Sequence, residues 1–204
     1  MKHLVISTLA FALTSGLAFA ASGGGSTSGG GGMGGGSGGT TQTDTTKNSP
    51  LKMKCKTGEV VKTVTKNGKS EKECVAVSGS LVPDGDLYHQ GWVLAKAGKY
   101  DWAIQVLSEV KDQSNPDVLT MLGYSNRKSG RVEEGFAFYQ KALAINPDHV
   151  RAHEYLGEGL VAQGKLEQAK FQLGEVKRIC GNTSCEEYED LAKAIKNGKD
   201  DDGL

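Results

Sequence analysis

The pattern of hydrophobic and polar residues divides the chain into segments of different character. Residues 22–50 are almost entirely Gly, Ser and Thr, residues 52–77 are rich in β-branched side chains, and apolar residues recur at helical spacing from Asp84 onward. A Gly/Ser/Thr segment cannot bury enough apolar surface to offset the entropy of ordering its backbone. We therefore predict a disordered linker over residues 21–50 and a short disordered tail over residues 198–204.

Residues 51–79 predict a small β-ribbon. Val60-Val61 and Thr63-Val64-Thr65 form a β-prone run, Asn67-Gly68 is a strong hairpin turn signal, and Cys74-Val75-Ala76-Val77 resumes the β-prone residues. A sheet of this size is marginal alone. A Cys55–Cys74 disulfide across the ribbon would stabilise it by about 3 kcal/mol on the chain-entropy model.

From Asp84 onward the sequence repeats. Gly91, Gly123 and Gly157 recur at spacings of 32 and 34 residues. Each is followed at fixed distances by a second glycine, a small residue and a large residue: Gly98, Gly130, Gly164; Ala103, Gly135, Ala169; Leu107, Tyr139, Leu173. The first glycine allows two antiparallel helices to approach closely, and the second ends the first helix of each pair. We predict helices over 84–97, 100–111, 116–129, 132–144, 149–163 and 166–179.

These residues resemble the tetratricopeptide repeat family, most closely in the copy from Pro116 to Pro147. The resemblance implies an all-α, right-handed helical solenoid of three helix hairpins over residues 84–182, here preceded by the small disulfide-closed β-ribbon. Ser184 and Glu187 have the spacing of a capping box. They predict a C-terminal capping helix over residues 183–197, which would cover the open end of the stack.

The resemblance also implies a concave groove lined by the first helix of each pair. Projection of the helical period places ten candidate peptide-binding residues there: Tyr88, Trp92, Lys96, Thr120, Tyr124, Arg127, Lys128, Arg151, Glu154 and Glu158. Our hypothesis is an extended or helical peptide with an apolar anchor near Trp92 and a carboxylate near Arg127 and Arg151. In the alternative, Tyr88 and Trp92 pack against the ribbon or the linker.

Residues 1–20 have the zones of a secretory signal peptide: a cationic start, an apolar run, and small residues at Ala18 and Ala20. We expect cleavage after Ala20, a periplasmic or secreted protein, and no membrane span after cleavage. In an oxidising compartment the four cysteines favour disulfides. Of the three possible pairings, Cys55–Cys74 and Cys180–Cys185 join residues of one local segment. A redox-active Cys180/Cys185 pair is the alternative, although its spacer is longer than the usual two residues.

Composition narrows the function further. The chain has 24 Lys+Arg and 24 Asp+Glu, which argues against a nucleic-acid partner. Residues 47–82 are basic, with 8 Lys and 3 Glu, and could bind an anionic cell-wall polymer or simply keep a thin ribbon soluble. The ribbon lysines are Lys52, Lys54, Lys56, Lys62, Lys66, Lys69 and Lys72.

The sequence contains no recognisable catalytic motif, and we expect no cofactor. His149 and His153 share a helical face near Glu154 and Glu158, but without a third placed ligand a packing role is favoured over a metal site. We therefore predict a non-enzymatic adaptor with a protein or peptide partner in the cell envelope. The alternatives are an envelope protein that binds cell-wall polysaccharide through the lysine ribbon and a thiol–disulfide oxidoreductase.

Overall fold

The computed structural model describes residues 49–79 and 81–199. The predicted signal peptide, residues 21–48 of the predicted linker and the last five residues of the predicted tail lie outside the described residues. The first described element is the one-turn helix α1 (Pro50–Met53), which includes the last residue of the predicted linker. Ser49 accepts a hydrogen bond from the Leu51 N–H at 3.2 Å, and Pro50 occupies the first helical position, which together start this turn.

The predicted ribbon is an antiparallel hairpin of β1 (Glu59–Lys66) and β2 (Lys69–Ala76). Its turn is Asn67-Gly68, where φ is +52° and +74°; two consecutive positive φ values match the twist of a tight hairpin. Val61 lies opposite Cys74, and the predicted Cys55–Cys74 disulfide is present.

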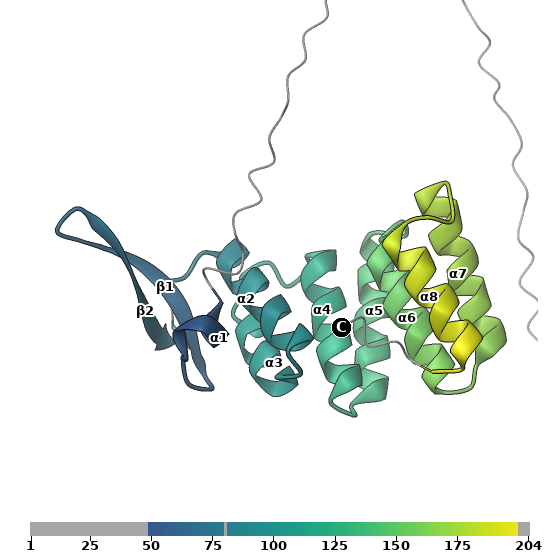
Figure 1. Ribbon diagram of the computed structural model, residues 1–204, viewed down its shortest axis with the longest axis horizontal. Coiled ribbons are helices and arrows are strands. Elements are labelled where there is room, and N and C mark those ends of the chain that lie inside the picture. The colour runs from purple at the N-terminus through teal and green to yellow at the C-terminus, as the bar shows by residue number, and fades with distance from the viewer. Residues whose placement is uncertain (1–48, 80, 200–204) are drawn as a thin grey trace, which may run out of the picture. The chain divides into compact units, whose positions relative to one another are not determined.

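The helices after the hairpin form a tetratricopeptide-like stack of helix pairs, as predicted (Figure 1). Each pair consists of two helices joined by a short turn and packed against each other. Within the described residues the pairs are α2 (Asp84–Lys96) with α3 (Tyr100–Ser108), α4 (Pro116–Lys128) with α5 (Val132–Ile145), and α6 (Val150–Ala162) with α7 (Leu166–Cys180). Helix α3 ends three residues before the predicted boundary, and beyond its end the Gln113 amide donates to the carbonyls of Leu107 and Val110.

The repeated glycines act largely as predicted. A Cβ on Gly123 would lie 2.6 Å from the Tyr139 ring, so α4 and α5 approach too closely for any side chain there. The third repeat differs, because Gly157 is covered by Leu191 of the last helix rather than by Leu173. The second glycines have φ values that favour glycine and end the first helix of each pair: Gly98 at +72°, Gly130 at +93° and Gly164 at +70°.

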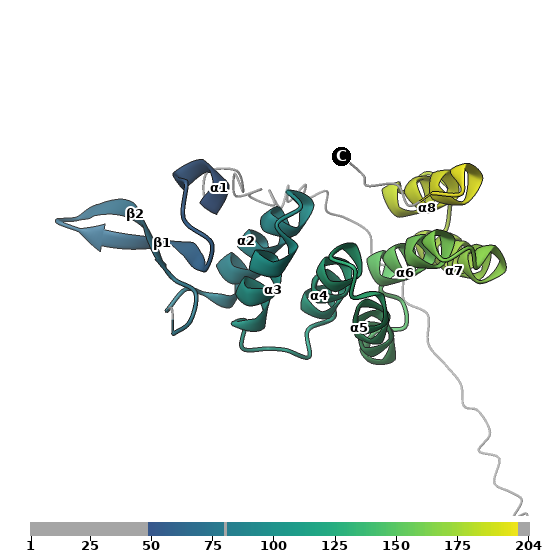
Figure 2. The same ribbon diagram turned by 90° about the horizontal axis from the view of Figure 1, so that it is seen from below.

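The last helix, α8 (Glu186–Asn197), packs against both α6 and α7 (Figure 2). Leu191 is fully buried in that contact, and the predicted Cys180–Cys185 disulfide joins α7 to α8. The predicted capping box is wrong. Cys185, not Ser184, is the N-cap residue, and Ser184 instead donates to the Asn182 side chain at 3.0 Å.

The ribbon docks on the first helix pair, a question the sequence left open. The Gln90 side chain of α2 accepts from the Val61 N–H at 2.6 Å and donates to the Val61 carbonyl at 2.9 Å, as a neighbouring strand would. The Trp102 indole of α3 donates to the Glu59 carbonyl at 3.0 Å. Val60 and Val61 are buried in the same apolar core as Leu94 of α2. The ribbon therefore shares the core of the stack.

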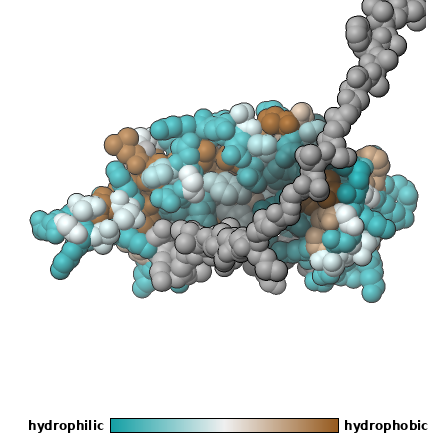
Figure 3. All heavy atoms as spheres, turned by 90° about the horizontal axis from the view of Figure 1, so that it is seen from above, coloured by the Kyte–Doolittle hydropathy of each residue, from teal (hydrophilic) through white to brown (hydrophobic). Residues whose placement is uncertain are grey.

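No helix within residues 49–79 and 81–199 has the length and apolar character that crossing a membrane requires. On the face shown in Figure 3, hydrophobic atoms occur in separate spots on a mainly hydrophilic surface. The large apolar side chains with most exposure, Leu81 and Phe171, lie far apart in the sequence.

Candidate functional site

A pocket of about 330 Å³ lies among α2, α6 and α8, and we call it the groove pocket. This volume falls within the range of small-ligand sites. Helices α2 and α6 supply Trp92, Lys96, Arg151, Glu154 and Tyr155. The first turns of α8 supply Glu186, Glu187 and Asp190. Four of the candidate groove residues thus meet at one place: Trp92, Lys96, Arg151 and Glu154. Carboxylates of α8, which the sequence predicts only as a capping helix, join them there.

Aromatic rings form one wall of this region. The ring centroids of Tyr124 on α4 and Tyr155 on α6 lie 4.8 Å apart. The Lys96 ammonium lies over both rings, 5.2 Å from the Tyr124 centroid and 5.8 Å from that of Tyr155, which is cation–π geometry. Burial, and then the nearby Glu154, raise the pKa of the Tyr155 hydroxyl, so this tyrosine stays neutral.

Several predicted groove residues are buried rather than presented to a ligand. Arg127 of α4 donates to the Glu158 carboxylate of α6 at 2.9 Å, and the two side chains are only 4% and 3% exposed. Its Nε also lies 3.3 Å from the Tyr139 hydroxyl. Thr120 is buried too and donates to the Pro116 carbonyl. The Arg127 guanidinium is therefore already paired with Glu158, and the structure does not present it to the carboxylate of a bound peptide.

Tyr88 and Arg151 both interact electrostatically with Asp117 of α4. Burial, followed by repulsion from Asp117, raises the pKa of Tyr88 to about 12. The Arg151 guanidinium is 3.7 Å from the Glu187 carboxylate of α8, a long ion-pair distance. Trp92 is half-buried, stacks against His89, and lines the groove pocket. Lys128 lies 5.8 Å from the Tyr124 ring centroid.

Glu154 has the most unusual environment in the groove pocket. Only 5% of the residue is exposed, yet within the described residues no hydrogen bond or ion pair reaches its carboxyl group. Burial, and then repulsion from Glu187, raise its pKa to about 8. The carboxyl is therefore mainly protonated at neutral pH. The charged groups that act on it are Glu187, Arg151, Asp190 and Lys96.

His149, the N-cap residue of α6, and His153 within this helix both make hydrogen bonds that support the packing role favoured by the sequence. His149 Nδ1 accepts from the Ala152 N–H, and its Nε2 lies 3.1 Å from Asp117, a hydrogen bond that lowers the pKa of this carboxyl group. His153 uses both ring nitrogens, with Gln172 at 2.6 Å and the Pro147 carbonyl at 2.9 Å. These bonds connect neighbouring helices and leave neither ring nitrogen of either histidine open for a metal.

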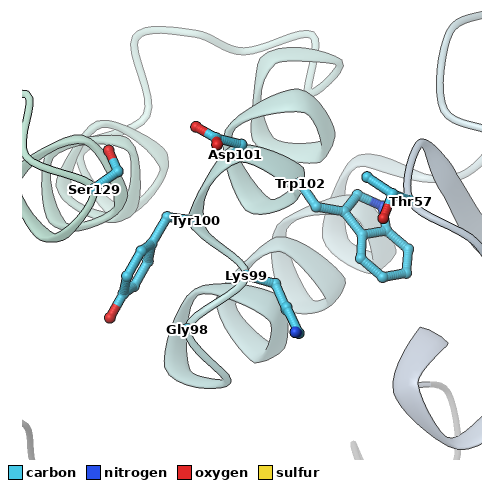
Figure 4. Close-up of a pocket in the computed structure, with 7 residues that line it drawn as sticks. All are labelled: Thr57, Gly98, Lys99, Tyr100, Asp101, Trp102 and Ser129. Carbon is cyan, nitrogen blue, oxygen red and sulfur yellow. The ribbon is translucent and has the colours of Figure 1, made fainter.

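A second pocket, of about 280 Å³, lies at the turn between α2 and α3 (Figure 4). Trp102 and Asp101 border it, but the Trp102 indole already bonds the ribbon and Asp101 pairs with Arg131 at 2.8 Å. These two polar groups thus serve the fold. The groove pocket, with its unsatisfied buried carboxyl, is the stronger candidate site.

One comparison with known protein families matches part of the helix stack. Residues 126–179 match the family model described as tetratricopeptide repeat. No curated protein sequence is significantly similar to the chain.

Similar solved structures include the first tetratricopeptide domain of Spaghetti (RPAP3) bound to the HSP90 peptide SRMEEVD. The two sequences are 23% identical, the match covers 56% of this chain and 90% of that chain, and the TM-score is 0.47. The first such domain of human RPAP3 has 22% identity over 56% of this chain and 94% of that chain, with a TM-score of 0.47. A MamA mutant has 30% identity over 56% and 67% of the respective chains, with a TM-score of 0.45.

Proposed function

We propose that this protein is a non-enzymatic interaction protein of the cell envelope that binds an extended or helical segment of a partner protein in the groove pocket. The observation that carries the proposal is the pocket itself, where the aromatic faces of Trp92 and Tyr155 meet charged groups from three helices. Aromatic anchors in a partly buried pocket, with polar groups around them, are the usual composition of a peptide-binding hot spot.

Export is part of the proposal. It rests on the signal-peptide zones of residues 1–20 and on the two disulfides within the described residues, because disulfides persist mainly in oxidising compartments. Sequencing the amino terminus of protein recovered from the envelope or medium tests this part. The expected terminus is Ala21, and an amino terminus at Met1 contradicts cleavage.

The binding proposal is tested by crosslinking in native envelopes followed by mass spectrometry and by pull-down with matched variants. Trp92→Ala removes an aromatic side chain that lines the groove pocket, whereas Phe171→Ala removes an exposed aromatic side chain of α7 outside it. We expect Lys96 to crosslink to a partner protein. Wild type and Phe171→Ala should retain this partner in the pull-down, and Trp92→Ala should lose it. Equal retention by both variants would count against the groove pocket.

The ribbon lysines support the polysaccharide alternative less well. Lys62 lies opposite Glu73 in the strand register, and the Lys66 ammonium is 3.3 Å from the Glu73 carboxylate, so carboxylates interrupt the positive charge. The variant Lys66→Gln/Lys69→Gln separates the two functions. We expect this double variant to bind a groove ligand as wild type does. If the ribbon instead binds an anionic polymer, the double variant has a lower affinity for the polymer, and wild-type binding falls steeply as the salt concentration rises to about 0.5 M.

A further inference from the structure

The Glu154 carboxyl group lines the groove pocket and bears on the charge of the segment that the pocket accepts. A buried polar group without a partner destabilises a protein, and such groups are rare in native structures. Glu158, one turn further along α6, has its donor in Arg127. Glu154 is as deeply buried and lines the groove pocket, but the described residues supply it no donor. The missing donor indicates a group that arrives with a ligand.

The other charges of the groove pocket indicate the sign of that group. Its lining side chains include two cations, Lys96 and Arg151, against Glu154 and three α8 carboxylates. Both cations act electrostatically on Glu154, but Lys96 lies over the tyrosine rings, and Arg151 is 3.7 Å from Glu187. The groove pocket therefore has an excess of negative charge around an unsatisfied acceptor, which suits a cationic donor.

On the basis of the proposed function, we propose that the groove pocket recognises a basic side chain, arginine or lysine, on the partner's peptide. Its cationic group donates to the Glu154 carboxylate next to Glu187 and Asp190, and its carbon chain or guanidinium plane packs on Trp92 and Tyr155. Charge-assisted hydrogen bonds to a buried carboxylate are strong. Arginine in particular pairs with carboxylates and stacks on aromatic faces at the same time.

The protonation of Glu154 makes this recognition depend on pH. With a pKa of about 8, the carboxyl holds a proton in the empty pocket near neutral pH. A bound cation favours the charged form, so binding releases a proton and strengthens as the pH rises from about 6 to about 8. The groups that face Glu154 and set this balance are Glu187 and Asp190 of α8, Arg151 of α6 and Lys96 of α2.

The test uses the full chain and a positional library of acetylated, amidated octapeptides. It compares wild type with Trp92→Ala, Glu154→Gln and the control Glu189→Gln, which changes an exposed carboxylate of α8 outside the pocket. Gln has the shape of a protonated Glu, so Glu154→Gln keeps the fold, and its circular dichroism spectrum and melting curve check this. We expect binders enriched in Arg or Lys, with affinity lowered about tenfold or more by Glu154→Gln and unchanged by Glu189→Gln.

The outcomes separate the two proposals. In one outcome, the binders depend on Trp92 but are uncharged or acidic, and Glu154→Gln binds them as tightly as wild type does. That outcome overturns the basic-side-chain inference and leaves the proposed function intact. A library with no binder that depends on Trp92 overturns both. A second readout for an Arg-containing binder is the proton release measured by calorimetry in buffers of different ionisation enthalpy. Release that persists unchanged in Glu154→Gln also overturns the assignment to Glu154.

Discussion

Arg127 and Glu158 form an ion pair of 2.9 Å in the interior, where it joins α4 to α6. The two residues come from successive repeats, 31 positions apart in the sequence. Almost no solvent reaches either side chain, so both charges rely on contacts inside the protein for their stabilisation. This pair therefore links neighbouring repeats.

Removing one member of this pair leaves the other charge buried. We expect Glu158→Gln to lower the free energy of unfolding by about 3–5 kcal/mol. The apolar double variant Arg127→Met/Glu158→Leu should be more stable than either single substitution, because no charge is then left alone. Urea denaturation of wild type, Glu158→Gln, the double variant and its two component single variants measures both effects. Additive losses in the double variant would contradict the coupling.

Gln90 replaces a neighbouring strand at the edge of β1. Gln90→Leu keeps the side-chain size but leaves the N–H and carbonyl of Val61 without their partner, so we expect a loss of about 1–3 kcal/mol. Hydrogen exchange should accelerate in the ribbon more than in α6 and α7. Gln140→Leu, at an exposed position of α5, is the control and should leave exchange unchanged. A ribbon that stays equally protected in Gln90→Leu would show that the apolar contacts alone hold it.

Two glycines in helices should respond oppositely to alanine. Gly123→Ala places a Cβ 2.6 Å from the Tyr139 ring and forces α4 and α5 apart, at a cost of about 1–3 kcal/mol or more. Gly174 of α7 faces open space, so Gly174→Ala should raise stability by about 0.5–1 kcal/mol through helix propensity. Thermal unfolding of both variants gives the comparison. A stabilising Gly123→Ala would contradict the close helix approach.

Glu154 should make stability depend on pH. Its folded-state pKa of about 8 is above its usual value of 4.5, so the folded protein binds its proton more tightly than the unfolded chain does. The resulting stabilisation is complete below about pH 4.5 and is lost as the pH rises towards and through about 8, with a slope of at most about 1.4 kcal/mol per pH unit. Wild type should therefore lose stability relative to Glu154→Gln between about pH 5 and pH 9. Parallel stability curves for the two proteins, measured by denaturant unfolding, would be inconsistent with this shift.

Much of the fold follows from signals that act over a few residues. The recurring glycines, small residues and large residues specify where helices end and where they approach, and the helix pairs agree with them. Asn67-Gly68 specifies the hairpin, because few other residue pairs adopt two positive φ values in succession. Both disulfides join cysteines that are close in sequence, so their pairing could be predicted from local segments. The capping box failed because the disulfide-bonded Cys185, rather than Ser184, starts α8.

The candidate site depends instead on distances between elements that are far apart in the chain. Helical periodicity places Arg127 and Glu154 on similar faces, but only packing decides that Arg127 meets Glu158 and that Glu154 meets no donor among the described residues. The same holds for Gln90, whose partner Val61 lies 29 residues away. The acidic turn of α8 enters the groove pocket because Leu191 packs over Gly157 of α6. Local sequence specifies helices, turns and crosslinks through backbone preferences, whereas burial and pairing of charges arise only when the helices have packed together.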